Sequence, residues 1–208
     1  AMGYYLRYPE NILGVISDCR FPKGGEKDSE AGLKLLQEIR KRDPFLPLII
    51  ESSESENKEK AEALGLRFID KNSKKMNIDL RNLMATHMGF GDFVFRDPKT
   101  HEEIKRIRNL KELQDNIFSI PNDSMLYHIS RNHVSRWLCA RAIFPVSEFL
   151  KTVTLEKLKD IDAHRQIIFD AIVQYRHMKN LGTVAVFRRE RFDAYSHFAR
   201  IGDGSLGG

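Results

Sequence analysis

The sequence predicts an α/β protein, with a partial parallel sheet and flanking helices, followed by a mainly α-helical region. Two observations predict it. Between residues 11 and 71, short apolar runs alternate with segments in which apolar residues recur at helical spacing, and such alternation is typical of a parallel sheet covered by helices. Beyond Gly89 the apolar spacing becomes largely helical.

The composition of the 208 residues is that of an ordinary globular protein, with 41% hydrophobic and 30% charged residues. It excludes wholesale disorder, collagen-like repeats and coiled coils. The longest apolar runs are too short to span a membrane or to form a signal peptide. Two cysteines cannot build a disulfide framework, so we expect a reducing, cytoplasmic compartment.

The first strand is expected at residues 12–16, an apolar run that leads to Asp18. A loop rich in glycine is expected over 21–28. Residues 31–40 carry leucine and isoleucine on one helical face, and this helix is expected to end before Pro44.

The next unit repeats this plan. We expect a strand at 46–50, a charged helix at 53–64 that Gly65 ends, and a third strand at 66–71. A helix at 79–88 closes the unit.

The elements beyond Gly89 follow from apolar spacing and proline positions. In chain order, we expect an extended or hairpin element at 92–100, an amphipathic helix at 110–120, a largely helical stretch at 124–150 interrupted at Pro145, one or two helices within 155–178 and a short strand at 183–187.

This pattern divides the chain into three predicted parts: an α/β domain at 1–89, a mainly helical connector domain at 90–154, and a helical linker at 155–208 that leads into a truncated domain. We expect both ends to be cuts from a longer chain. The first two residues are typical of a cloning scar, and the sequence stops inside a glycine-rich motif.

Three polar residues mark the carboxyl ends of the three expected strands: Asp18, Ser52 and Lys71. Open α/β sheets bind ligands at this edge, so we expect the three to converge. A carboxylate there can accept a phosphoryl group, and a hydroxyl and an ammonium can hold the phosphoryl oxygens. The simpler alternative is that they are ordinary strand-end residues that cap and pair among themselves.

In these residues the sequence resembles the response-regulator receiver family. The match covers Asp18 to Pro22, with proline four residues after the aspartate, then Ser52 and Lys71 after the next two strands. The resemblance implies a flavodoxin-like sheet, with Asp18 as phosphoacceptor and Ser52 and Lys71 as the switch hydroxyl and phosphoryl-binding ammonium. It also implies Mg²⁺ held by Asp18 and the backbone of Arg20, and a histidine kinase or other phosphodonor as partner.

The chain also departs from the family. The family's first two strands, and the acidic pair that supplies most of its metal site, would precede residue 11. Asn72 stands where a proline usually follows the lysine, and the loop between Asp18 and Gly32 is long. We therefore expect an incomplete Mg²⁺ site, because one carboxylate binds this ion poorly without substrate phosphates. A pseudo-receiver that serves as a scaffold without phosphorylation is the alternative.

The end of the chain resembles the opening of the nucleotide-binding domain of phosphoenolpyruvate synthase and pyruvate phosphate dikinase. There a glycine pair, here Gly207 and Gly208, precedes a lysine that contacts ATP. Receiver-like modules followed by a Ser-Arg-Asn-His stretch, here at 130–133, precede such domains in some bacterial proteins. The resemblance implies a regulatory segment of an ATP-dependent phosphotransferase, with ATP bound only in the parent protein and its catalytic domains as partners. On composition alone, the glycines favour a flexible tail.

Residues 127–138 form a second polar cluster. His128 and His133 are five residues apart, so we expect them to lie poorly together on one helical face as metal ligands. The excess of basic residues around Trp137 makes a nucleic-acid patch conceivable, but the excess is small and no helix-turn-helix pattern supports it. A helix with a buried Trp137 and a solvated basic side is the simpler interpretation, and a docking face for another domain is the other. Cys139 is expected to be a buried structural thiol.

If the sheet lacks the family's first strand, the strand at 12–16 lies at its edge. An apolar edge strand promotes pairing with another chain. We therefore expect a homodimer through this edge.

Overall fold

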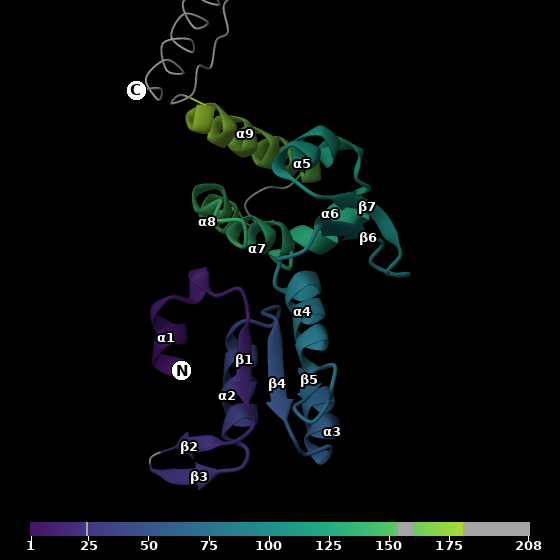
Figure 1. Ribbon diagram of the computed structural model, residues 1–208. Helices are drawn as coiled ribbons and strands as arrows, with labels where there is room; N and C mark the ends of the chain where they lie inside the picture. Colours follow the sequence, from purple (N-terminus) through teal and green to yellow (C-terminus); the bar gives the residue numbers. More distant parts are fainter. Residues whose placement is uncertain (24, 154–159, 181–208) are drawn as a thin grey trace, which may run out of the picture.

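The computed structural model of the protein describes residues 1–23, 25–153 and 160–180 (Figure 1). The first half contains, in chain order, α1 (Met2–Arg7), the 3-10 helix η1 (Pro9–Asn11), β1 (Val15–Asp18), β2 (Phe21–Lys23), β3 (Glu26–Asp28), α2 (Ala31–Arg42), β4 (Leu48–Ser52), α3 (Glu56–Ala63), β5 (Arg67–Asp70) and α4 (Met76–His87).

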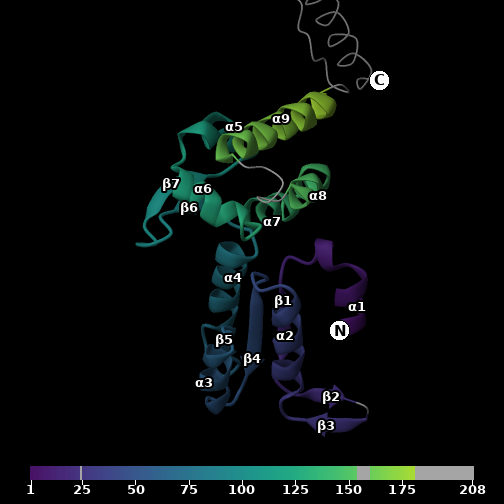
Figure 2. The same cartoon turned by 180° about the vertical axis from the view of Figure 1, so that it is seen from behind.

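A three-stranded parallel sheet in the order β1-β4-β5 forms the centre of this half. Alternate residues of the central strand β4 face opposite sides, as the pleat requires. Leu48 and Ile50 pack with Leu36 and Ile39 of α2, whereas Ile49 packs with the side chains of α4. Helices therefore cover both faces, and the protein is mixed α/β as predicted (Figures 1 and 2).

Strands β1 and β4 begin and end two or three residues later than predicted, whereas β5 lies within its predicted range. The apolar residues Ile12 and Leu13 precede β1, because they pack into the cores on the two faces before the chain enters the sheet. Gly14 marks the entry: a Cβ there would lie 2.7 Å from the Cε atom of Met88 and 2.9 Å from the Pro47 carbonyl oxygen. As a result, Asp18 is the last residue of β1 rather than a residue of the following loop.

Two elements of this half differ from the sequence prediction. The loop expected over 21–28 is a hairpin, in which β2 and β3 pair in antiparallel register. Three-residue strands carry too little alternation to be recognised in the sequence. Helix α1 was not predicted either. Its Tyr5 is 6% exposed and packs into the core under α2.

The second half contains β6 (Phe93–Arg96), β7 (Glu103–Ile107), α5 (Leu110–Asn116), the 3-10 helix η2 (Ile117–Ser119), α6 (Asn122–Ile129), α7 (His133–Cys139), α8 (Phe144–Thr152) and α9 (Ile161–Asn180). Strands β6 and β7 form the expected hairpin. Pro145 lies in the first turn of α8, where a proline is tolerated, so the expected interruption is a helix start.

One hydrophobic core serves this second half. It joins Phe93 and Phe95 of β6 to Trp137 and Leu138 of α7, and it includes Ile168 of α9. Trp137 is buried, as predicted. Helix α9 therefore packs on the same core as the helices before it, against α5, α6 and α8. The strand expected at 183–187 lies outside the described residues.

A short glycine-containing linker joins the two halves, and α7 and the turn after it hold this linker. The Trp137 indole N–H donates to the Gly91 carbonyl at 3.1 Å. Arg141 stacks on the Trp137 ring at 4.0 Å and donates to the carbonyls of Gly89 and Gly91, each at 2.7 Å. We call these four residues the joint.

Two basic residues of the 127–138 cluster contact the α/β half. Arg136 is 7% exposed and donates to the Phe45 carbonyl at 3.2 Å. The Arg131 guanidinium lies 4.2 Å from the centre of the Tyr127 ring and 5.3 Å from that of Phe45. The solvated basic side expected here is therefore wrong for Arg136, whereas Arg131 is partly exposed. The interpretation as a docking face fits these contacts, with the α/β half of this same chain as the docked part.

None of the described helices has the length and the apolar character that crossing a membrane requires.

Candidate functional site

The backbone brings the three predicted site residues to one edge of the sheet. Asp18 ends β1 and Ser52 ends β4, and both strands point the same way. Lys71 follows β5, and its backbone N–H donates to the Ser52 carbonyl at 2.9 Å. The convergence predicted from the strand ends is therefore present in the structure.

Asp18 and Lys71 form an ion pair at this edge. The Lys71 Nζ atom contacts Oδ2 of Asp18, and the other carboxylate oxygen accepts the backbone N–H of Arg20 at 3.2 Å. Partial burial raises the pKa of Asp18, but the hydrogen bonds from Lys71 and Arg20 outweigh it, so the pKa lies below its usual value. Asp18 is therefore a carboxylate, and its side chain is 46% exposed, so that a reactant can approach it.

Ser52 lies at the same edge of the sheet as Asp18 and Lys71, but its hydroxyl is hydrogen-bonded to other residues. It is buried, and its Oγ accepts from the Asn57 side-chain amide at 2.9 Å and from the Glu54 backbone N–H at 3.1 Å. Within the described part of the chain, no hydrogen bond joins Ser52 Oγ to Asp18 or Lys71. The hydroxyl here organises the turn that leads into α3.

Arg20 and Glu54 border the pair on its solvent side. The Arg20 guanidinium contacts the Glu54 carboxylate, which also accepts from the Asn57 amide at 3.2 Å. Glu54 thus links the exposed edge to the buried amide that holds Ser52. Sequence reasoning missed Glu54 and Asn57, because a surface glutamate and an asparagine in a charged helix carry no distinctive pattern.

The described residues do not fit a Mg²⁺ ion. Among residues 1–23, 25–153 and 160–180, no group of three or more His, Cys, Asp or Glu side chains could hold a metal. Mg²⁺ requires an octahedral set of oxygen ligands, whereas the carboxylates of Asp18 and Glu54 are both paired with basic side chains. We therefore derive no chemical step through this ion.

The two cysteines are free and buried, as predicted for Cys139. Cys19 adjoins the candidate site, but its thiol points into the core and donates to the Ser29 carbonyl at 3.3 Å. Burial and the nearby Asp18 charge raise the pKa of the Cys19 thiol, which keeps it protonated and unreactive. Cys19 therefore supports the fold of the site and supplies no nucleophile.

His128 and His133 do not share one helical face, as expected, but their rings meet across two helices. Their Nδ1 atoms are 3.0 Å apart. The helical stretch breaks between α6 and α7, where Asn132 has a left-handed backbone with φ of 56°. The two histidines therefore belong to different helices, and the five-residue spacing on one helix does not apply.

The hydrogen bonds of this pair fix its protonation. At a bulge of the β6–β7 hairpin, the backbone N–H of Arg96 donates to Nε2 of His128 at 3.0 Å. His128 must then carry its proton on Nδ1 and donate to Nδ1 of His133. Burial, with the nearby Arg96, lowers the pKa of His128 to about 4, and burial with His128 beside it lowers the pKa of His133 to about 3. Both rings are neutral at pH 7.

The fold and the site together define a mixed α/β protein with an acid–lysine pair at the carboxyl edge of a parallel sheet. No family model matches the chain, and no curated protein or solved structure does so either. The resemblance to receivers at Asp18, Ser52 and Lys71 therefore stays a prediction. The second resemblance, at Gly207 and Gly208, lies outside the described residues.

Proposed function

We propose that this chain is a receiver-like regulatory segment in which Asp18 accepts a phosphoryl group. The observation that carries the proposal is the contact between the Lys71 ammonium and the Asp18 carboxylate at the carboxyl edge of the sheet. The lowered pKa and the half-exposed position of Asp18 support it, because a nucleophilic carboxylate must be ionised and accessible.

The proposed transfer uses an acyl phosphate as donor. A carboxylate oxygen of Asp18 attacks the phosphorus, the bond between phosphorus and the acyl oxygen breaks, and the acyl group leaves as a carboxylate without any proton transfer. Lys71 then pairs with the phosphoryl oxygens in place of the free carboxylate. The added charge draws on hydrogen-bond donors nearby. The Ser52 oxygen accepts from Asn57 and Glu54, so the hydroxyl still has its own proton to donate, and rotation of the side chain would bring it to the phosphoryl group.

A movement of Ser52 would change the structure at the start of α3. Ser52 and Glu54 together hold the Asn57 amide at the start of α3. Rotation of the Ser52 hydroxyl toward a phosphorylated Asp18 would leave the buried amide with Glu54 alone. The turn between β4 and α3 is therefore the proposed switch element.

Mass spectrometry of the intact chain tests the proposal. After incubation with acetyl phosphate and Mg²⁺, we expect an adduct of about 80 Da, the mass of one phosphoryl group. The variant Asp18→Asn should lack it, and the matched variant Asp70→Asn, at the end of the neighbouring strand β5, should keep it. An adduct that persists in Asp18→Asn, or no adduct in the unchanged chain, would refute the role of Asp18.

A second candidate is a pseudo-receiver, an interaction module that is not phosphorylated. The side chains around Asp18 favour this candidate. The described residues do not fit Mg²⁺, and the Asp18 carboxylate already has a partner in Lys71. In this case the ion pair only fixes the ends of β1 and β5. The absence of an adduct, together with a lower stability of Asp18→Asn, supports this candidate.

We further propose that this segment precedes ATP-dependent phosphotransferase domains in the same chain. The resemblances at residues 130–133 and at Gly207 and Gly208 support this proposal. A chain extended beyond Gly208 tests it: phosphotransfer by the extended chain should differ between the unchanged sequence and Asp18→Asn. Nucleic acid is a weaker candidate partner, because Arg131, Arg136 and Arg141 bind rings and carbonyls of the chain itself.

A further inference from the structure

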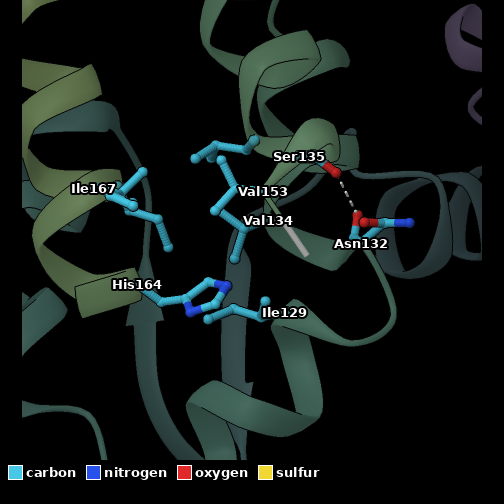
Figure 3. A pocket seen from close by; sticks show the side chains of 9 residues that line it. Ile129, Asn132, Val134, Ser135, Val153, His164 and Ile167 are labelled. Carbon is cyan, nitrogen blue, oxygen red and sulfur yellow. Dashed lines mark hydrogen bonds between the residues drawn. The ribbon is translucent and has the colours of Figure 1, made fainter. Parts of the chain in front are cut away.

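Helices α8 and α9 pack against each other in the second half of the molecule (Figure 1). The end of α8 and the start of α9 help to enclose a small cavity beside His164, with a volume of about 20 Å³ and room for about one water (Figure 3). An open groove of about 210 Å³ lies between the start of α8 and the later part of α9. The groove, unlike the cavity, is large enough to receive side chains of another segment.

The wall of this groove is mostly apolar and faces solvent. It includes Phe149 of α8, which is 47% exposed, and Met178 of α9, which is 57% exposed. Asp170 is the only acidic residue among the described residues that line it, and its carboxylate accepts from the Gln166 side-chain amide at 2.9 Å. An exposed apolar groove between two helices is typical of a surface that binds another segment of protein.

The chain leaves α9 beside this groove. Helix α9 ends at Asn180, two residues after Met178. Residues 181–208 lie outside the described part of the chain, but their sequence begins with features that suit the groove. Gly182 follows the end of the helix, where a glycine commonly lets the chain turn. Residues 184–188 are Val-Ala-Val-Phe-Arg, and in an extended segment the two valines face the same side.

The length of this segment matches that of the groove. Asp170 and Met178 lie about 12 Å apart along the axis of α9. Residues 184–188 span about 13 Å when they are extended. If the segment runs back along the helix from Met178, its last residue, Arg188, comes level with Asp170. The single acidic side chain of the described wall then meets a basic side chain.

We propose that residues 184–188 dock in the groove between α8 and α9 and run antiparallel to α9. The two valines pack on the wall at Phe149 and Met178, and the Arg188 guanidinium pairs with the Asp170 carboxylate. Burial of the valines and of the exposed wall favours the docked segment. Docking fixes the path by which the chain leaves the second half.

A second copy of the chain is the competing occupant of the groove. The chain's own segment has the advantage, because a short tether to the end of α9 gives it a high effective concentration at the groove. Residues 154–159 are less well placed, since they join the opposite ends of the two helices.

NMR of the full chain with labelled methyl groups tests the docking. We expect nuclear Overhauser effects between the methyls of Val184 and Val186 and those of Ala171 and Met178, which line the groove. We expect none to Val173, which is 39% exposed on the same stretch of α9 but is not among the described lining residues. Isotope-filtered spectra of mixed labelled and unlabelled chains separate contacts within one chain from contacts between two. Contacts between two chains, or no contact at the groove, would overturn the proposal.

Two phenylalanines of α8 give a matched pair of variants. Phe149→Ser removes part of the groove wall and should abolish the contacts of the valines. Phe144→Ser alters a residue that is 48% exposed on the same helix but is not among the described lining residues, and it should keep the contacts. Contacts that persist in Phe149→Ser would show that the segment does not use this groove. The spectra of the unchanged chain decide the question even if a variant does not fold.

A third variant tests the ion pair. Asp170→Asn should lower the docked fraction, because Arg188 loses its partner. The control Asp79→Asn, at an exposed position of α4, should leave the docked fraction unchanged. An equal docked fraction in both variants would refute the pairing of Arg188 with Asp170.

Discussion

At the scale of single residues, the pair of His128 and His133 is the most unusual chemistry outside the candidate site. Two imidazoles share one hydrogen bond beside Phe93 and Phe95, whose rings meet His128 edge to face. The backbone N–H of Arg96 holds the acceptor nitrogen of His128. This arrangement needs both rings to be neutral, and that requirement makes the stability of the second half depend on pH.

The stability should fall in weak acid. An unfolded histidine titrates near pH 6.5, whereas the pKa is about 4 for His128 and about 3 for His133 in the fold. Between these values the unfolded chain binds more protons, so the stabilisation is complete above pH 6.5 and is lost as the pH falls toward 4. From pH 7 to pH 4.5, we expect a loss of roughly 2–3 kcal/mol from His128 alone.

Urea unfolding followed by Trp137 fluorescence at the two pH values measures this loss. The variant His133→Gln removes one titrating ring, and its stability should depend less on pH than that of the unchanged chain. The exposed His101→Gln serves as the control and should keep the full dependence. Equal pH dependence in all three chains would contradict the assignment.

The sequence predicts a site well when local strand patterns determine it, and poorly when it depends on the conformation of one turn or one residue. The position of Asp18, Ser52 and Lys71 at one edge follows from three local strand patterns and the rule for parallel sheets. The bonds of Ser52 with Asn57 do not, because they depend on the turn between β4 and α3. The histidine pair depends on a single residue, Asn132, whose left-handed backbone ends one helix and begins the next. An asparagine before a helix is a possible sign of such a break, but an uninterrupted helix is equally compatible with the residues around it.

At the scale of elements, α9 is held by one buried guanidinium. Arg165 is 2% exposed and donates to the carbonyls of Ile117 at 2.5 Å and Ile120 at 2.6 Å, and to the Asn122 side chain at 2.7 Å. These acceptors lie at η2 and the start of α6, where the last carbonyls of a helical turn lack partners. Arg165 therefore ties α9 to the segment between α5 and α6.

Replacement of this arginine should be costly. In Arg165→Met the side chain still fills space, but the buried carbonyls lose their donor, and we expect a loss of about 2–4 kcal/mol in the free energy of unfolding. Urea denaturation of the purified variant gives this value. The matched variant Gln166→Met, on the exposed side of the same helix, should change stability by less than about 0.5 kcal/mol. Equal losses in the two variants would mean that the carbonyl contacts do not stabilise α9.

The elements also show what apolar patterns predict and what they do not. The apolar patterns predict all three strands of the parallel sheet and the helices α2, α3 and α4, because each of these elements turns apolar side chains toward a core. They misplace the start of β1 by three residues, since Ile12 and Leu13 are partly buried against the two cores before the chain pairs in the sheet. An apolar run indicates that residues pack in a core but not that they pair in a sheet, and here the packed residues come before the strand begins.

At the scale of the whole molecule, the joint decides how the two halves are connected. Gly89 has φ of 86°, and a Cβ at this position would lie 2.9 Å from the Trp137 Cα and 3.1 Å from the Arg136 carbonyl oxygen. Both neighbours are backbone atoms, which cannot move aside cheaply. Only glycine fits the backbone conformation and the close approach together.

The variant Gly89→Ala should therefore loosen the joint. We expect a loss of roughly 1–3 kcal/mol in unfolding free energy, from strain and from weaker contacts of Trp137. The control is Gly3→Ala, at a position where a Cβ meets nothing within 4 Å. Thermal unfolding monitored by circular dichroism compares the two, and an unchanged midpoint in Gly89→Ala would show that the joint tolerates a side chain.

The second whole-molecule prediction concerns the free edge of the sheet. The N–H groups of Val15 and Cys19 point to β4, so that those of Ile16 and Asp18 face outward by alternation. Ile16 is 39% exposed, whereas Ile12 and Leu13 are packed in the cores. The apolar edge is therefore shorter than the run at 12–16 predicts, yet it remains available for pairing with a second copy.

Light scattering over a range of concentrations tests this pairing. We expect a dimer, and the variant Ile16→Lys should shift it to a monomer, because a charge on an edge strand opposes association. The matched variant Ile78→Lys alters an isoleucine that is 59% exposed on α4 and should leave the dimer intact. A monomer at every concentration would contradict the prediction.

The candidate site and the joint lie at opposite ends of the α/β half, and α4 runs between them (Figure 1). This helix begins at Met76, five residues after Lys71, and ends at His87, just before Gly89. Its 12 residues form a rod about 18 Å long. A tilt of about 5° at the Lys71 end moves the other end by about 1.5 Å. Helix α4 thus has the geometry of a lever between the candidate site and the joint. Its side chains pack on Ile49 and Ile69 along the way, so a tilt of this helix would be felt by the sheet face as well as by the joint.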